Sequence, residues 1–249
     1  MATSRLESSA MNASAGKKAK RLIIGCGTGR CGTVSLVKFL DSQPGVSVLH
    51  EGVVGSDRRG HHLVPWYEGE AQLWPWLAEL ENRSGDADWY GDAGFYFLPY
   101  LPAIFKRHPT SRAICLERDR KQVIRSYLEK TEGRNHWFRH EGDGWAQDPE
   151  WDPCYPHYAE QDKRKALGLY WDQYHSTAME YCARFPDQFL LLPTAALNEV
   201  SGRRKLLEFI GYEVERAVDG QFRANASYKN RLRRTMTRVS SLFGAGRHP

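Results

Sequence analysis

The chain has 249 residues, of which 41% are hydrophobic and 26% charged, so it is long enough and apolar enough to bury the core of one sizeable domain. No apolar run reaches the roughly 18 residues of a spanning helix, and we expect no stable membrane insertion. The net charge of +5 comes from the ends, since residues 1–21 carry five Lys/Arg and residues 220–249 carry seven, which leaves 23 basic against 29 acidic residues between them. This distribution argues against a nucleic-acid surface and favours a local anion site or solvated tails.

The two basic ends also mark the expected domain boundaries. Residues 1–20 are rich in Ser and Ala and lack the apolar segment of a secretory signal, which predicts a disordered tail. We expect one α/β domain over residues 21–230 and a basic, flexible tail over residues 231–249. The five cysteines have irregular spacing and form no Cys-x-x-Cys pair, which indicates core thiols in a reducing compartment and a cytoplasmic protein. The oligomeric state stays open.

The domain begins with the pattern of a strand, a turn, a helix and a second strand. The short apolar run 21–25 ends in glycine and is typical of a buried strand. Apolar residues at helical spacing predict a helix over 34–40, which a Pro-Gly turn ends. Residues 46–49 predict a second strand that delivers His50 and Glu51 to its carboxyl end. A strand–helix–strand unit of this length implies a parallel sheet.

The remaining chain continues the alternation. Residues 52–95 receive no assignment, and the Trp-, His- and Pro-rich residues 133–158 predict a long irregular loop of the kind that forms lids or binding loops. Further helices are predicted over 99–106, 120–130, 160–184 and 203–210, and further strands over 112–116 and 189–192. The expected fold class is α/β, with three α/β/α layers around a mainly parallel central sheet.

A glycine-rich turn joins the first strand to the first helix, with the sequence Gly25-Cys-Gly-Thr-Gly-Arg-Cys-Gly-Thr33-Val-Ser35. Glycines there let successive backbone N–H groups converge, and the helix N-terminus adds unpaired donors and partial positive charge, so the turn suits a phosphate group. The hydroxyls of Thr33 and Ser35 and the charge of Arg30 add to this character. The alternative is a tight turn without a ligand; we favour binding because a strand precedes the turn and a helix follows it.

Two known phosphate-binding patterns fit the turn in part. A Walker-type loop requires lysine after its last glycine, and Thr33 stands in that place, which disfavours a kinase or NTPase. The dinucleotide fingerprint is present as Gly27-x-Gly29-x-x-Gly32, and Glu51 lies close to the expected distance of about 20 residues for a ribose-binding acid. An NAD(P)-dependent oxidoreductase is therefore an alternative function, although Arg30 puts a bulky cation where the backbone would approach the pyrophosphate.

A second motif follows the predicted strand at 112–116, since Arg118-Asp-Arg-Lys-Gln-Val-Ile-Arg-Ser126 places a serine eight residues after an arginine. Together with Gly29-Arg-Cys-Gly-Thr33 it resembles the two nucleotide-binding motifs of the sulfotransferases that use 3′-phosphoadenosine 5′-phosphosulfate (PAPS). Leu206-Leu-Glu-Phe-Ile-Gly211 resembles a late helix of that family. The resemblance covers scattered blocks over residues 21–211, and a dinucleotide enzyme has no reason to carry the second motif. It implies a fold like that of the P-loop nucleotide kinases and a PAPS-dependent sulfotransferase.

The resemblance implies a role for each residue of the two motifs. The ligands of the 5′-phosphosulfate come from one segment: Gly27, Thr28, Gly29, Arg30, Cys31, Gly32, Thr33, Val34 and Ser35. Arg30 would stabilise charge on the leaving phosphate as an electrostatic clamp, because a guanidinium does not readily give up a proton. Arg118 and Ser126 would hold the 3′-phosphate. Transfer would be an in-line displacement governed by positioning and charge stabilisation.

A hydroxyl or amine acceptor also needs a base, and the resemblance implies the glutamate at the end of the second strand, Glu51. Because adjacent side chains on a strand point to opposite faces, we expect only one of His50 and Glu51 to face the site. His50 is assigned to the acceptor and stays the alternative base. Arg30 would lower the pKa of Glu51, so burial or a neighbouring acid such as Asp92 has to offset it. Asp92 is assigned to the acceptor, with a turn-forming aspartate as the alternative.

Several features leave alternatives open. The aromatic residues within 65–100 and 136–158 suit either an acceptor or the core. His136 and His140 have helical spacing without a nearby acid, and we predict no metal. Three late basic residues are candidates to supplement the 3′-phosphate site: Arg223, Lys229 and Arg231. The expected acceptor is a small molecule, a glycan or a lipid headgroup, and a non-catalytic nucleotide-binding module is the second alternative function.

Overall fold

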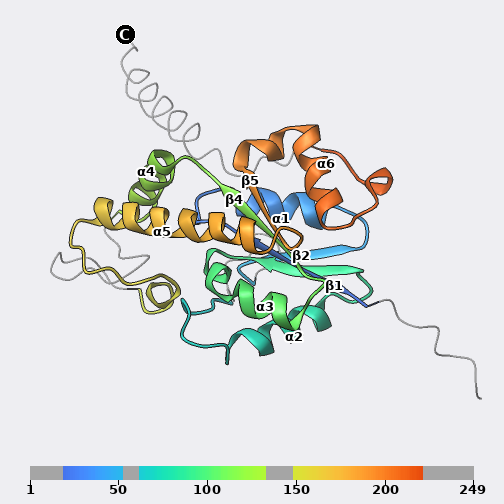
Figure 1. The fold of residues 1–249 in the computed structure, drawn as a ribbon, viewed down its shortest axis with the longest axis horizontal. Coiled ribbons are helices and arrows are strands. Elements are labelled where there is room, and N and C mark those ends of the chain that lie inside the picture. The colour runs from blue at the N-terminus through green and yellow to red at the C-terminus, as the bar shows by residue number, and fades with distance from the viewer. Residues whose placement is uncertain (1–18, 53–61, 133–147, 221–249) are drawn as a thin grey trace, which may run out of the picture.

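The computed structural model describes residues 19–52, 62–132 and 148–220. They form three layers, with a sheet between two layers of helices (Figure 1). The α/β fold class with a parallel central sheet is therefore confirmed. The predicted tail 231–249 and nearly all of the predicted tail 1–20 lie outside the described residues, and the domain boundaries stay predictions.

The sheet has five parallel strands: β1 (Arg21–Cys26), β2 (Val46–His50), β3 (Trp89–Ala93), β4 (Arg112–Glu117) and β5 (Phe189–Pro193). Their order is β2-β3-β1-β4-β5, which makes β1 the central strand between β3 and β4. The first two strands are parallel, as predicted, but they are not neighbours because β3 lies between them. In the dinucleotide-binding fold the second strand lies beside the first.

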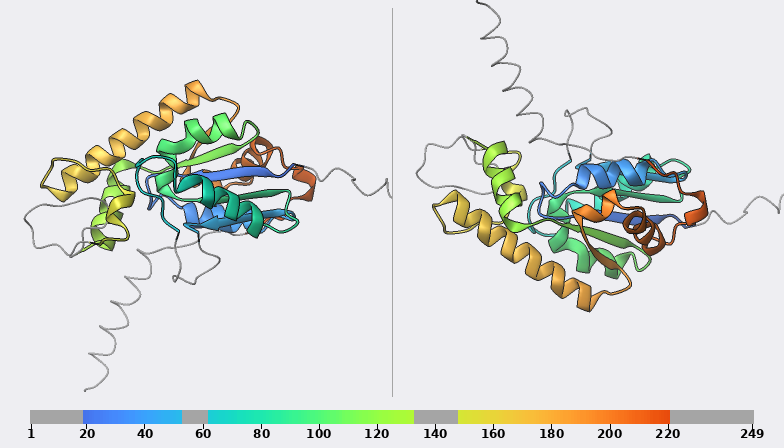
Figure 2. Two further views of the ribbon diagram at one scale, coloured as in Figure 1. Left: turned by 90° about the horizontal axis from the view of Figure 1, so that it is seen from below. Right: turned by 90° about the horizontal axis from the view of Figure 1, so that it is seen from above.

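The described helices are α1 (Thr33–Asp41), α2 (Leu73–Arg83), α3 (Leu101–Arg107), α4 (Arg120–Lys130), α5 (Lys163–Arg184) and α6 (Val200–Phe209), with short 3₁₀ turns η1 (Phe95–Tyr100), η2 (Asp152–Cys154), η3 (Thr194–Asn198) and η4 (Val214–Arg216). Side chains of β1 alternate between the two faces of the sheet, with Leu22 and Ile24 on one and Ile23 on the other. The first face packs against α2, α3, α4 and α5, and the second against α1 and α6 (Figure 2). Across the described residues, no helix combines the length and the apolar character required to pass through a bilayer.

Two elements, α2 and β3, lie in the segment that received no assignment from the sequence. All five residues of β3 are buried. Glycine is required at position 91, because a Cβ there would lie 1.7 Å from the carbonyl oxygen of Ile23 in β1. Glycine and aspartate are depleted in strands, so local propensity conceals a strand that packing of the sheet selects.

The other elements agree with the predicted ones to within a few residues. The side chains of Asp119 and Asp162 accept hydrogen bonds from backbone N–H groups in the first turns of α4 and α5. The second of these caps places the start of α5 at Lys163, slightly later than predicted. Of the predicted loop 133–158, the described part begins at residue 148 and includes η2. All five cysteines are free, and four of them are buried core thiols as predicted, while Cys182 is half-buried.

Candidate active site

The two predicted nucleotide motifs meet at the carboxyl edge of the sheet, where β1 and β4 are neighbours. The glycine turn follows β1 and leads to α1, which packs on one face of the sheet. The turn at Arg118 follows β4 and leads to α4, which packs on the other face (Figure 2). Adjacent strands whose connections leave to opposite faces form the switch point at which open α/β sheets bind ligands.

The glycine turn uses backbone conformations that favour glycine. Gly27, Gly29 and Gly32 have φ angles of 144°, 74° and 100°. A side chain at position 29 is excluded by space as well, since a Cβ there would lie 2.1 Å from the hydroxyl oxygen of Tyr127. Arg30 holds a φ of 56° although it is not glycine. Such left-handed residues cost free energy and gather at functional sites.

The start of this turn is hydrogen-bonded to three buried tyrosines, Tyr127 of α4 and Tyr170 and Tyr174 of α5. We call these three residues the tyrosine brace. The carbonyl oxygen of Thr28 accepts hydrogen bonds from the hydroxyls of Tyr127, at 2.5 Å, and Tyr170, at 3.0 Å. The hydroxyl of Tyr174 accepts from the N–H of Gly27 at 2.8 Å. The sequence predicted a helix over residues 160–184, but not that tyrosine hydroxyls from it would support the turn.

Two further carbonyl groups of the turn, those of Arg30 and Cys31, accept hydrogen bonds from side chains of distant segments. The carbonyl oxygen of Arg30 accepts from Nη1 of Arg118 at 2.8 Å, and that of Cys31 accepts from Oγ1 of Thr194 at 2.6 Å. Within the described part of the chain, no acceptor is found for three backbone N–H groups here, those of Arg30, Gly32 and Val34. Carbonyls turned inward with N–H groups left over at a helix N-terminus make a site for an anion.

The second motif touches the first directly. Nε of Arg30 donates to Oγ of Ser126 at 3.1 Å, while Arg118 reaches the backbone of Arg30. Burial and the neighbouring Arg30 guanidinium lower the pKa of Arg118. Two positive charges held close together in a half-buried site favour the binding of an anion between them. The structure therefore brings together Arg30, Arg118 and Ser126, which are far apart in the sequence.

His50 and Glu51 follow at the same carboxyl edge of the sheet, and their side chains approach each other there. Nδ1 of His50 is 3.6 Å from Oε2 of Glu51, and Nε2 of His50 is 2.9 Å from Oγ1 of Thr33 in α1. The expectation that only one of the two faces the site stays a prediction. Strand alternation ends at His50, because Glu51 takes a left-handed conformation with φ of 52°.

Asp92 lies in β3, next to β2, and is fully buried. Its carboxylate accepts hydrogen bonds from the backbone N–H groups of Gly52, at 3.1 Å, and Ala93, at 2.8 Å, and from Nε1 of Trp76 at 3.2 Å. The turn-forming alternative is therefore wrong, since this aspartate is part of a strand. Its contacts with Gly52 fix the backbone that follows Glu51, and its role toward an acceptor stays a prediction.

The environment sets the proton affinity of Glu51. Burial and the neighbouring Asp92 carboxylate raise its pKa to about 8, against the opposing effect of Arg30. Burial likewise raises the pKa of Asp92 to about 7, although its hydrogen bonds act in the other direction. The lowering of the Glu51 pKa by Arg30 is thus offset, as expected, by both burial and the neighbouring Asp92. Carboxylates with raised pKa values are typical of functional sites.

Other predicted residues of the turn differ in what they offer. The side chain of Thr28 is buried and donates to the carbonyl of Gly29 at 3.0 Å. The thiol of Cys31 is fully buried, which raises its pKa to about 12. The N–H of Ser35 already donates to the carbonyl of Gly32 at 2.8 Å. The candidates His136, His140, Arg223, Lys229 and Arg231 lie outside the described residues.

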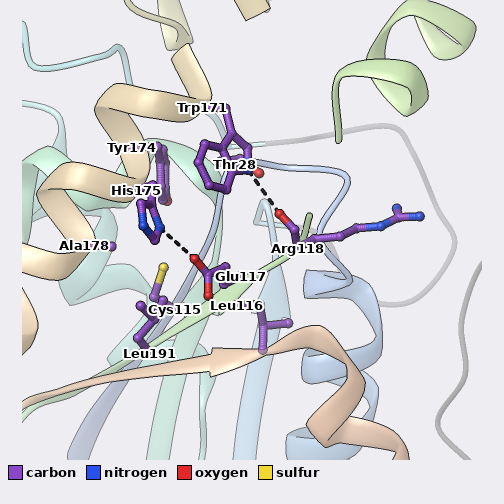
Figure 3. A pocket seen from close by; sticks show the side chains of 10 residues that line it. All are labelled: Thr28, Cys115, Leu116, Glu117, Arg118, Trp171, Tyr174, His175, Ala178 and Leu191. Carbon is purple, nitrogen blue, oxygen red and sulfur yellow. Dashed lines mark hydrogen bonds and ion pairs between the residues drawn. The ribbon is translucent and has the colours of Figure 1, made fainter. Parts of the chain in front are cut away.

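A small slot between α5 and the end of β4 adjoins the second motif (Figure 3). Nε1 of Trp171 donates to the carbonyl of Arg118 at 3.1 Å, and Nδ1 of His175 is 2.6 Å from Oε1 of Glu117. The rings of Trp171 and His175 stack with centroids 4.8 Å apart. Figure 3 shows the Arg118 side chain extending away from the slot. Helix α5 therefore holds the backbone from which Arg118 reaches the glycine turn.

Comparisons with known proteins give structural likenesses. Neither a family model nor a curated protein matches the chain. Among solved structures, it is similar to a sulfotransferase from Alicyclobacillus acidocaldarius, with 15% identity, a TM-score of 0.49 and coverage of 88% of this chain and 91% of that one. It is also similar to the sulfotransferase domain from the curacin biosynthetic pathway, with 14% identity, a TM-score of 0.40 and coverage of 84% and 81%. At such identities and TM-scores, neither likeness extends to activity or substrates.

Proposed function

We propose that the chain is a sulfotransferase that moves a sulfuryl group from PAPS to a hydroxyl or amine acceptor. One observation carries the proposal: the glycine turn and the Arg118/Ser126 pair are in direct hydrogen-bond contact at the switch point of the sheet. The 3′- and 5′-phosphates of PAPS sit on one ribose, so binding both requires two anion-binding elements side by side. A nucleotide with 5′-phosphates alone has no group for the second element.

Each end of the donor finds suitable groups. The 5′-phosphosulfate would accept from the backbone N–H groups of Arg30, Gly32 and Val34, where the N-terminus of α1 adds partial positive charge. The 3′-phosphate would accept from the guanidinium of Arg118 and the hydroxyl of Ser126. Guanidinium groups suit this task because they present several donors in one plane and stay charged.

The reaction follows from the places of Glu51 and Arg30. Ionised Glu51 takes the proton of the acceptor hydroxyl, and the acceptor oxygen forms a bond to sulfur. The bond from sulfur to the 5′-phosphate oxygen breaks in line, and its electron pair leaves with 3′,5′-adenosine bisphosphate. Arg30 stabilises the charge on that leaving oxygen. With a pKa of about 8, Glu51 is a stronger base than an ordinary carboxylate, although it is mostly protonated at neutral pH.

The alternatives fit the structure less well. In a dinucleotide-binding fold the ribose-binding acid follows a strand beside β1, but β3 occupies that place here and Glu51 follows β2. A kinase would need a lysine where Thr33 stands. A non-catalytic binding module has no use for a buried glutamate with a raised pKa beside His50 and Arg30. The acceptor is proposed at the level of class, as a small molecule, glycan or lipid headgroup, with His50 on its side of the site.

Calorimetric titration with 3′,5′-adenosine bisphosphate, AMP and NAD tests the nucleotide class. We expect the bisphosphate to bind most tightly, and Arg118→Ala to weaken it by about 10- to 100-fold while AMP changes by less than about threefold, because charge-assisted hydrogen bonds to phosphate are lost. Arg112→Ala, at the opposite end of β4, is the matched control. Tightest binding of NAD, or equal weakening of both adenylates by Arg118→Ala, would contradict the proposal.

Transfer itself is tested with ³⁵S-labelled PAPS and a metabolite extract. We expect labelled product from the wild type, and loss of transfer with retained bisphosphate binding in Glu51→Gln. His50→Gln distinguishes the two candidate bases, because it should leave the pH dependence of transfer in place if Glu51 is the base. A wild type that binds the bisphosphate but labels no acceptor would favour the binding module.

A further inference from the structure

Gln122 lies on the face of α4 that also carries Ser126, because the two residues are four positions apart in the helix. Oε1 of Gln122 accepts a hydrogen bond from Nε of Arg118 at 3.1 Å. The same guanidinium donates through Nη1 to the carbonyl of Arg30, whose own Nε bonds Ser126. Gln122 is therefore the fourth side chain at the junction of the two motifs, and the sequence resemblance assigned it no role.

This contact fixes which way the amide of Gln122 points. Arg118 stays protonated and presents only donors, so the amide oxygen must face it and the NH₂ group must face elsewhere. Two of the guanidinium nitrogens of Arg118 are engaged by Gln122 and Arg30, which leaves Nη2 of Arg118 to donate elsewhere. The carboxylate of Asp119 is occupied in capping α4 at the N–H of Gln122, at 3.0 Å.

The junction is thus rich in donors and positive charge. The charges of Arg30 and Arg125 both lower the pKa of Arg118, in addition to burial. A neutral amide tolerates this arrangement, whereas a carboxylate at position 122 would pair with Arg118 and repel an anion. The chain therefore has an uncharged side chain at the point where a negative one would neutralise the site.

We propose that Gln122 is a specificity-determining residue for the 3′-phosphate: it orients the guanidinium of Arg118 through its amide oxygen and donates to the phosphate through its amide nitrogen. The inference rests on the proposed function, since it needs a nucleotide that carries a 3′-phosphate. It extends the predicted pair of Arg118 and Ser126 to a set of three.

The test compares the Kd for 3′,5′-adenosine bisphosphate with the Kd for AMP, by calorimetry on the full chain. Gln122→Glu should reduce the preference for the bisphosphate by about tenfold or more, because the added carboxylate pairs with Arg118 and repels the dianion. Gln122→Met keeps the length and removes the amide, so the preference should fall by about three- to tenfold. The control is Asn82→Asp, which adds the same charge in the last turn of α2, a helix that packs against β3.

The outcomes separate the inference from the proposed function. A wild type without preference for the bisphosphate would overturn both. A wild type with that preference, combined with Gln122→Glu and Gln122→Met variants that keep it within about twofold, would overturn the inference alone. Equal weakening of both nucleotides by Gln122→Glu would also overturn it, since a general effect on the turn cannot distinguish the 3′-phosphate. Position 122 is exposed, so the variants should fold, and thermal unfolding of each variant checks this.

Discussion

Replacement of Asp92 by asparagine should move the pH dependence of transfer toward lower pH. In the wild type, burial and the charge of Asp92 raise the pKa of Glu51 to about 8. A base with that pKa is about 1% ionised near pH 6 and half ionised near pH 8, so kcat/KM of the wild type should rise about 50-fold over this range. Asp92→Asn removes one cause of the shift and leaves the burial. The pKa of Glu51 should fall, and the rise should be complete at a lower pH.

The assay is kcat/KM for labelled sulfate transfer from about pH 5.5 to 9.5, each profile normalised to its own plateau so that lost stability does not enter. An NMR titration of the ¹³C-labelled Glu51 carboxyl gives the same pKa without turnover. Asp86→Asn, in the exposed turn before β3, is the control for a lost acidic charge elsewhere. A flat wild-type profile between about pH 6 and pH 8, or an Asp92→Asn profile displaced toward higher pH, would refute the reasoning.

Three further variants test other parts of the site. Glu51→Gln should become more stable than the wild type as pH rises. The pKa of Glu51 is about 8 in the folded state and 4.5 ordinarily, so the stability that protonated Glu51 contributes is complete below about pH 4.5. That stability is lost as pH rises to about 8, whereas glutamine does not titrate. The gain should reach a few kcal/mol by about pH 9 in urea unfolding, and an equal difference at about pH 4.5 would contradict it. Gly29→Ala should cost about 1–3 kcal/mol, because φ is 74° and the new Cβ would meet the Tyr127 hydroxyl; adding Tyr127→Phe should recover part of that loss in the same unfolding assay. Trp171→Phe keeps a ring against His175 but removes the donor to the carbonyl of Arg118, so it should weaken the bisphosphate several-fold and leave AMP unchanged in calorimetry.

Much of the fold could be predicted because hydrophobic periodicity reports the elements that bury one face. The four strands found from sequence contain runs of apolar side chains, whereas β3 contains Gly91 and Asp92 and has no such pattern. Its position between β1 and β2 depends on pairing between distant segments. The glycine at position 91 makes sense only beside Ile23, which it approaches too closely for any side chain.

In the candidate site, too, the local motifs could be predicted from sequence and the contacts between distant segments could not. Spacing identified the glycine turn and the motif from Arg118 to Ser126, because each of them lies in one stretch of chain. The hydrogen bond between Arg30 and Ser126 joins the two motifs only in the folded chain, so the spacing within each motif could not predict it. The contact between His50 and Glu51 also escaped prediction, since the alternation rule holds within a strand and Glu51 lies just beyond its end.

The tyrosine brace makes the shape of the glycine turn depend on residues 99 and 142 positions further along the chain. The hydroxyls of Tyr127 and Tyr170 both donate to one carbonyl oxygen, that of Thr28. Loss of either leaves this buried oxygen with one donor, whereas loss of both leaves it with none, at a cost of about 1–3 kcal/mol. Positions 127 and 170 should therefore covary among homologous chains, with phenylalanine tolerated at either site only where tyrosine is kept at the other.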